Sequence, residues 1–75
     1  MSKQRKAQLP KVPPPTEPEA AEARVRRLVS EGARLLAARR PGEAIPMLEE
    51  ALSLDPNNVS AAINLGGALI LQGKY

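Results

Sequence analysis

Apolar residues recur every three or four positions along three stretches of this chain, which is the spacing of one face of a helix. In the first stretch they are Ala21, Val25, Leu28, Gly32 and Leu35, with Val29 and Leu36 beside them. The segment Thr16-Glu17-Pro18-Glu19 has the form of a capping box, so we expect this helix to begin after Thr16. It should end near Arg39 or Arg40, because Pro41-Gly42 breaks a helix.

A second helix is predicted over about 42–54 and a third over about 59–72. The second has its apolar face at Ile45, Leu48, Ala51 and Leu52, with Met47 beside it, and the third at Ala62, Leu65, Gly66, Leu69 and Ile70. If Gly42 is the N-cap, Pro46 removes the first bond within the second helix, so we expect a slight bend and no break. Asp55-Pro56-Asn57-Asn58 should form a turn, and Gly73 should close the third helix.

The first and third stretches also repeat each other at a spacing of about 34 residues. Val25, Gly32 and Leu35 recur as Val59, Gly66 and Leu69, and Val29 and Leu36 recur as Ile63 and Ile70. A repeated helical unit buries its apolar face against a neighbouring unit. Because the chain stops partway through the second copy, we expect the last helix to have an uncovered apolar face.

Residues 1–15 differ in composition, being rich in Lys, Gln and Pro with three consecutive prolines. We predict a disordered arm over 1–15 and a helical region over 16–75. Two PxxP matches in and next to the arm, at 10–13 and 15–18, fit the ligands of SH3-type domains. Such matches are common by chance, so we favour a solvated spacer over an SH3-type ligand. The predicted fold is all-α: an antiparallel helix hairpin followed by a third helix.

The residue types of this chain give little support for a catalytic site or a cofactor site. The sequence has no Cys and no His, so thiolate sites and the usual general base at neutral pH are excluded. Glu49 and Glu50 are adjacent on a predicted helix and point in different directions, and Gly66-Gly67 lies inside a helix rather than in a phosphate-binding loop. We therefore expect no catalytic residue, no metal site and no cofactor.

The net charge of +3 is spread along the chain. Residues 1–24 hold five basic and three acidic residues, residues 25–75 hold six and five, and Tyr75 is the only aromatic residue. Nucleic-acid binding through the basic arm is therefore a weaker alternative. Neither a signal peptide nor an apolar membrane span is evident, so we expect a cytoplasmic protein without membrane contact.

These residues resemble the tetratricopeptide repeat (TPR), a helix pair with small residues at fixed positions. The first-helix places are taken by Leu28, Glu31-Gly32 and Leu35, the second-helix places by Ala44, Leu48, Ala51 and Pro56, and the next unit by Ala62, Leu65-Gly66, Leu69 and Gly73-Lys74-Tyr75. The resemblance implies one repeat over about 25–58 and a truncated second repeat over 59–75. It also implies close helix crossings at Gly32 and Ala44, with Ala51 making room for the third helix.

The resemblance has departures. Leu28, Leu35 and Leu48 stand where the family usually has aromatic residues. Glu31 stands where the family has an apolar residue, which would suit an N-terminal capping repeat.

TPR proteins stack into a superhelix whose first helices line a concave, partner-binding face. The resemblance therefore implies a non-catalytic interaction module that binds a peptide or partner helix, of apolar rather than acidic character. The matching positions are Arg26, Val29, Ala33, Leu36 and Ala37 in the first repeat, and Ser60, Ile63, Asn64, Gly67, Ile70 and Leu71 in the second. A simpler interpretation is that Val29, Leu36, Ile63 and Ile70 pack against neighbouring helices.

Other interpretations remain open at this stage. One branch of the family clamps a C-terminal carboxylate with a lysine and two asparagines. Here Asn64 matches one asparagine, but Val29 and Ala33 replace the other two residues, so we predict no such clamp. The chain could instead self-associate, with another copy supplying the missing helix, or be a targeting or regulatory repeat attached to a catalytic domain beyond Tyr75.

Overall fold

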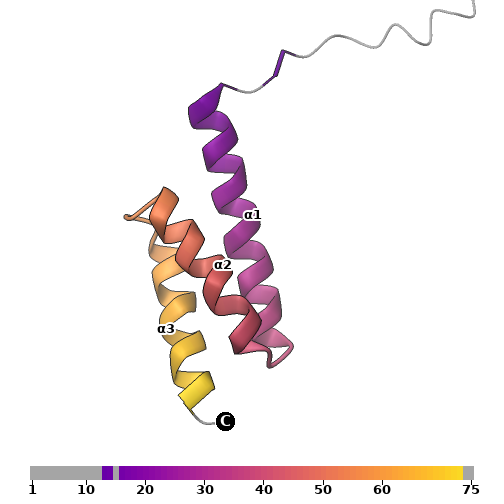
Figure 1. Ribbon diagram of the computed structural model, residues 1–75, viewed down its shortest axis with the longest axis vertical. Coiled ribbons are helices and arrows are strands. Elements are labelled where there is room, and N and C mark those ends of the chain that lie inside the picture. Colours follow the sequence, from indigo (N-terminus) through magenta and orange to yellow (C-terminus); the bar gives the residue numbers. More distant parts are fainter. Residues whose placement is uncertain (1–12, 15, 74–75) are drawn as a thin grey trace, which may run out of the picture.

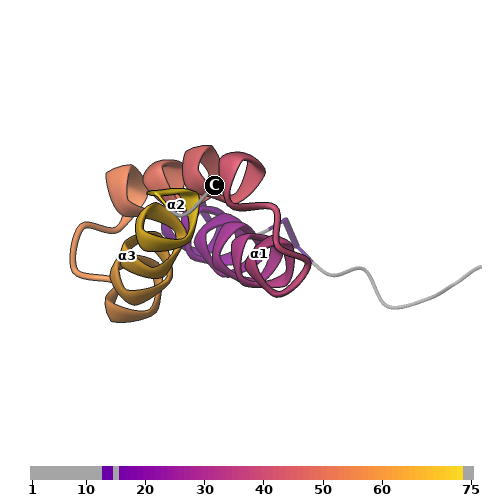
Figure 2. The same cartoon turned by 90° about the horizontal axis from the view of Figure 1, so that it is seen from below.

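The computed structural model describes residues 13–14 and 16–73 and contains three helices. They are α1 (Glu17–Ala37), α2 (Pro41–Leu54) and α3 (Val59–Gly73), as Figure 1 shows. Figure 2 shows α1 and α3 side by side, with α2 lying across both. No strand occurs in the described part of the chain, so the predicted all-α fold is confirmed. Apart from Pro13 and Pro14, the arm predicted over 1–15 lies outside the described residues, as do Lys74 and Tyr75.

The start of α1 confirms the predicted capping box. The Glu19 N–H donates to Thr16 Oγ1 at 3.4 Å, and the Thr16 N–H donates to Glu19 Oε1 at 3.1 Å. Pro18 lies in the first turn, where its missing N–H has no intrahelical partner to lose. These bonds fix the point at which the chain enters the helix.

The end of α1 differs from the prediction. The helix stops at Ala37, because Arg39 adopts a left-handed backbone conformation with φ 63°. The Arg39 N–H donates to the Leu36 carbonyl and the Arg40 N–H donates to the Leu35 carbonyl, both at 2.9 Å. This is the Schellman arrangement, which satisfies the last carbonyls of a helix and usually has glycine at the left-handed position. The helix therefore ends before Pro41 is reached.

The start of α2 also lies earlier than predicted. Its N-cap is Arg40 rather than Gly42, and Pro41 is the first helical residue, a position that suits proline. Arg40 Nε donates to Glu43 Oε2 at 2.8 Å. The helix runs through Pro46 without a break, as expected. Because α2 starts at Pro41, the bond that Pro46 cannot form is the one to the Gly42 carbonyl.

The predicted turn over 55–58 also holds the start of α3 through side-chain hydrogen bonds. The Asn58 side-chain oxygen accepts a hydrogen bond from the Ala61 N–H at 2.8 Å, and its amide nitrogen donates to Asp55 Oδ2 at 3.2 Å. Asn58 therefore caps the N-terminus of α3 and ties it to the turn. Gly73, predicted to close the third helix, is the last helical residue described.

The core is made of small and branched side chains from all three helices. One cluster contains Leu35, Ala44, Leu48 and Ala68, and the other contains Val25, Ala51 and Ala61. Leu48 and the four alanines have no exposed surface. A Cβ atom built on Gly32 would lie 2.7 Å from Leu48 Cδ2, so the close crossing expected at Gly32 is confirmed.

The packing face predicted for α3 was wrong. Of the predicted positions only Leu65 packs against the core, whereas Ala62, Leu69 and Ile70 are exposed. The fully buried residues are Ala61 and Ala68. Because α3 is apolar on nearly every side, the pattern could not identify its packing face, and small alanine side chains allow the closer approach to α1 and α2.

Candidate protein-interaction surface

The predicted binding positions on α1 are only partly accessible. Arg26 is exposed, while Val29, Ala33 and Leu36 are half-buried. Val29 packs against the Val25, Ala51 and Ala61 cluster, and Leu36 packs against the cluster around Leu48. Part of the α1 face is therefore used to hold the three helices together.

The predicted positions on α3 are mostly exposed. Ser60, Ile63, Gly67 and Ile70 are open to solvent, with 69% of Ile63 and 67% of Ile70 exposed. Asn64 is half-buried, and its amide donates to the Ser60 carbonyl at 2.9 Å. Of the two flanking positions, Ala37 is exposed and Leu71 half-buried. The two halves of the predicted surface therefore differ: the repeated positions are partly covered on α1 and free on α3.

Repeat-equivalent residues show the same contrast in burial. Val25 is 4% exposed but Val59 is 69% exposed, and Leu35 is 8% exposed but Leu69 is 52% exposed. The residues are identical, so the difference lies in their neighbours. α1 contacts both other helices along this side, whereas the matching side of α3 has no helix against it in the described residues.

The outer face of α1 differs in chemistry from the side of α3 that is equivalent to it by the repeat. α3 packs through Ala61, Leu65 and Ala68. The residues one repeat earlier on α1 are Arg27, Glu31 and Arg34, and Arg34 forms an ion pair with Glu31. A polar face at this position is solvated and offers no packing surface for a further helix. This supports the interpretation of Glu31 as part of an N-terminal capping repeat.

A groove of about 430 Å³ lies beside the first turns of α1. It is lined by Pro18, Ala21, Glu22, Val25 and Arg26 from α1, by Leu54 at the end of α2, and by Asp55 and Asn58 from the turn that follows. Of the predicted binding residues, only Arg26 reaches it. No sequence pattern predicts this groove, because it is formed between segments far apart in the chain.

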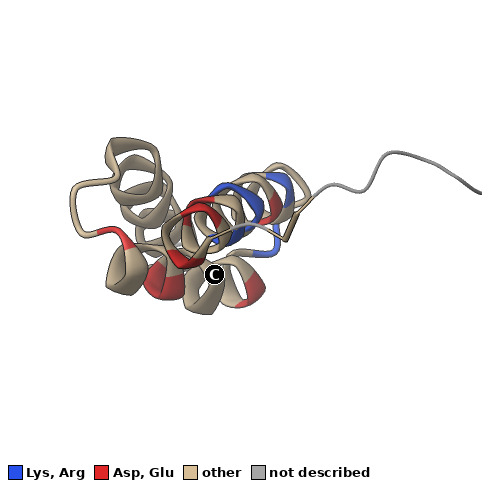
Figure 3. Ribbon diagram, turned by 90° about the horizontal axis from the view of Figure 1, so that it is seen from above, with Lys and Arg blue, Asp and Glu red and all other residues tan. Residues whose placement is uncertain are grey.

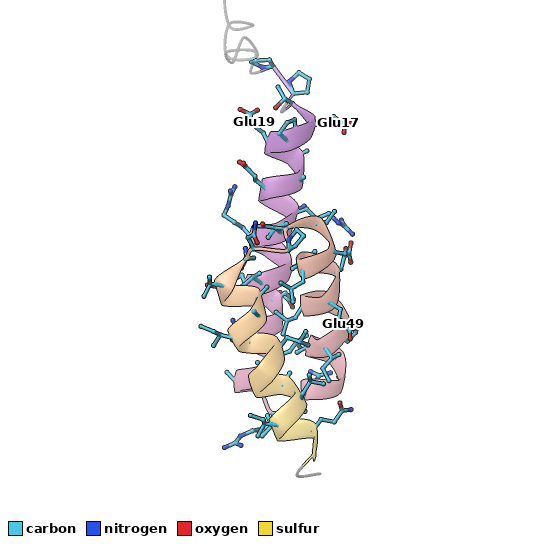
Figure 4. The ribbon with its side chains drawn as sticks, turned by 90° about the vertical axis from the view of Figure 1, so that its left-hand side faces the viewer. Glu17, Glu19 and Glu49 are labelled. Atoms are coloured by element: carbon cyan, nitrogen blue, oxygen red, sulfur yellow. The ribbon has the colours of Figure 1, made fainter. Side chains whose placement is uncertain are left out.

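Charged residues are concentrated on α1 and α2, and α3 has none (Figure 3). Arg24 Nε donates to Glu50 Oε2 at 2.8 Å, which links α1 to α2. Glu49 is exposed and lies along α2, well away from Glu17 and Glu19 at the start of α1 (Figure 4). In residues 16–73, no group of three or more acidic side chains is placed to hold a metal ion.

The helix order, the turn at 55–58 and the close crossing at Gly32 are those of a repeat unit, and a family model of the tetratricopeptide repeat matches residues 35–75. The match covers more than half of the chain. The chain belongs to the tetratricopeptide repeat family. TPR units generally mediate protein–protein interactions and are typically not catalytic. Comparison with curated proteins and with solved structures gives no match.

The matched TPR segment contains the end of α1, all of α2 and the described part of α3. None of the helices described is both long enough and apolar enough to cross a membrane. The feature that sequence reasoning missed in this segment is the capping role of Asn58. Its signal was an asparagine directly before the third apolar stretch.

Proposed function

We propose that the chain acts as a non-catalytic interaction module that binds an apolar peptide or helix of another protein. The binding face consists of the first-helix positions on α1 and α3: Arg26, Val29, Ala33, Leu36, Ser60, Ile63, Asn64, Gly67 and Ile70. The observation that carries the proposal is the exposure of Ile63 and Ile70. Two large aliphatic side chains one above the other on a helix are typical of a surface that a partner covers.

The absence of charge on α3 supports an apolar segment as the partner of this face. Val59–Gly73 contains no charged residue, so the α3 part of the face cannot offer ion pairs to an acidic or basic tail. An apolar side chain placed between Ile63 and Ile70 would bind favourably, because apolar surface of both partners would be removed from water. Among the proposed residues the charged one is Arg26 on α1, which lines the groove.

Selection from a peptide-display library, followed by NMR titration, tests the proposal. Random peptides selected on the chain are expected to be rich in Leu, Ile and aromatic residues. Their binding should shift the amide signals of Ile63, Gly67 and Ile70. Ile63→Glu should weaken binding at least about tenfold because it places a charge in an apolar contact. The matched control is Glu49→Lys, which changes a charge on exposed α2 surface and should leave binding unchanged. Signal shifts confined to α2 would contradict the proposal.

A further inference from the structure

The exposed side of α3 has an internal symmetry. Ile63 and Ile70 lie on one side of the helix, with Gly66 and Gly67 between them. A Cβ atom built on either glycine meets no other atom within 4 Å, so the space in front of them is open. With 3.6 residues per turn, this stripe lies on the side opposite the buried Ala61 and Ala68. The stripe reads nearly the same in both chain directions, with its centre between the two glycines.

Such a stripe fits a second copy of itself. If two α3 helices cross antiparallel about a two-fold axis between Gly66 and Gly67, Ile63 of one copy faces Ile70 of the other, and the converse contact follows by symmetry. The glycines have no side chain at the point of closest approach, so the two isoleucine pairs can meet on either side of it. A parallel pairing would instead set each isoleucine against its own equivalent.

The charge distribution favours a second copy over a charged partner. In a two-fold contact every charge near the axis meets a like charge from the other copy. This repulsion destabilises a dimer formed through a charged surface. α3 has no charged residue from Val59 to Gly73, so this repulsion is absent (Figure 3). Four of the five large exposed hydrophobic residues of the described chain also lie on α3.

We infer that two copies of this chain associate through their α3 helices, antiparallel, with Ile63 of each copy against Ile70 of the other. The inference rests on the proposed function in one respect, because it names a second copy as a partner of the same face. Association should stop at a dimer. A two-fold contact uses the same surface of both copies, so neither copy keeps that surface free for a third chain. On the opposite side of the three-helix unit, α1 presents the polar residues Arg27, Glu31 and Arg34.

The test is sedimentation velocity of the full 75-residue chain, with circular dichroism to verify that each variant is helical. A contact made mainly by two isoleucine pairs should be weak, so the concentration should be varied from about 5 to about 500 µM. Ile63→Glu and Ile70→Lys should each weaken dimerisation at least about 100-fold, because each sets an unpaired charge against an isoleucine. Both side chains are mostly exposed in the single chain, so neither change disturbs the core.

Mixing the two variants tests the antiparallel register. In an equimolar mixture, Glu at 63 of one chain meets Lys at 70 of the other, while the remaining Ile70 and Ile63 meet each other. The mixture should therefore regain dimers at concentrations where each variant alone is monomeric. Gln72→Glu is the control, since it adds a charge to an exposed position of α3 on the side away from the stripe.

Three results would overturn the inference: a wild-type monomer at every concentration, a dimer that both single variants preserve, or a mixture that stays monomeric. Peptide binding by a monomeric chain, with shifts at Ile63 and Ile70, would leave the proposed function intact while rejecting the dimer. If the chain dimerises as inferred but its monomers, obtained by dilution, bind no selected peptide, the dimer stands and the proposed function is rejected.

Discussion

Gly32 of α1 lies so close to Leu48 of α2 that a Cβ atom on the glycine would sit 2.7 Å from Leu48 Cδ2 and 2.8 Å from its Cγ. Leu48 has no exposed surface and cannot swing into solvent to make room. The equivalent glycine of the second repeat, Gly66, has nothing within 4 Å of its Cβ position. The same residue is therefore required by packing in one helix and free in the other.

This contrast predicts opposite effects of one substitution. Gly32→Leu should lower the free energy of unfolding by about 1–3 kcal/mol, because the added side chain overpacks the crossing of α1 and α2. Gly66→Leu should be neutral or stabilise the single chain by up to about 1 kcal/mol, since leucine favours helix over glycine. Urea denaturation followed by circular dichroism, at a concentration where the chain is monomeric, measures both. Equal losses in the two variants would contradict the packing argument.

The fold could be predicted from the sequence where pattern and chemistry agree. The capping box at Thr16 and Glu19, the turn at 55–58 and the apolar face of α1 all follow from local residue types. The end of α1 could not, because it depends on Arg39 taking a backbone conformation that arginine rarely adopts. The packing face of α3 could not either, because an uncharged helix has no polar side to identify its apolar one.

The exposure of the candidate site residues could not be predicted from the sequence. The 34-residue register marks Val29 and Ile63 as equivalent, yet Val29 packs on the core and Ile63 is 69% exposed. Exposure depends on which helices lie next to each copy, and that is a property of the assembled chain. The groove beside Arg26 was unpredictable for the same reason.

The left-handed Arg39 offers a simple stabilising change. Arg39→Gly should raise the free energy of unfolding by about 0.5–1 kcal/mol. Glycine adopts the left-handed conformation without strain, and this gain is partly offset because glycine has more conformational freedom in the unfolded chain. Arg39→Ala is the control: it removes the same charge but keeps the Cβ atom, so it should show no such gain. Thermal or urea denaturation distinguishes the two, and indistinguishable glycine and alanine variants would rule out strain as the cause.

Asn58 should contribute more to stability than its neighbour in the turn. Asn58→Ala removes the acceptor for the Ala61 N–H and should cost about 0.5–2 kcal/mol. Asn57→Ala changes an exposed residue of the same turn and should stay within about 0.5 kcal/mol of the parent. The difference in denaturation midpoint between the two variants measures the cap. A larger loss at Asn57 would show that turn geometry matters more than capping.

The polar outer face of α1 should limit association to one side of the chain. Replacing Arg27, Glu31 and Arg34 with the residues of α3, as Arg27→Ala, Glu31→Leu and Arg34→Ala together, would give α1 an apolar outer face. This variant should form species larger than a dimer at concentrations at least about tenfold lower than the parent. Arg39→Ala, which makes the same change in net charge, serves as control in sedimentation velocity. An unchanged size distribution would argue against a capping role.

Peptides ending in a free acidic carboxylate should not bind. Val29 and Ala33 provide no polar group, and the Asn64 amide is engaged with the Ser60 carbonyl of its own helix. Titration calorimetry with an EEVD-type peptide should give no heat beyond dilution. Measurable binding that Asn64→Ala abolishes would refute this prediction.

The unequal packing of the three helices also sets the order in which they open. α1 and α2 are held together by the Gly32 crossing and the Arg24–Glu50 ion pair, whereas α3 is anchored mainly through Ala61, Leu65 and Ala68. Local unfolding begins where the fewest apolar contacts must break. Backbone amides of α3 should therefore exchange with deuterium faster than those of α1 and α2, and a partner that covers Ile63 and Ile70 should slow them most. The helix that presents the binding surface would then be the one whose order depends most on being bound.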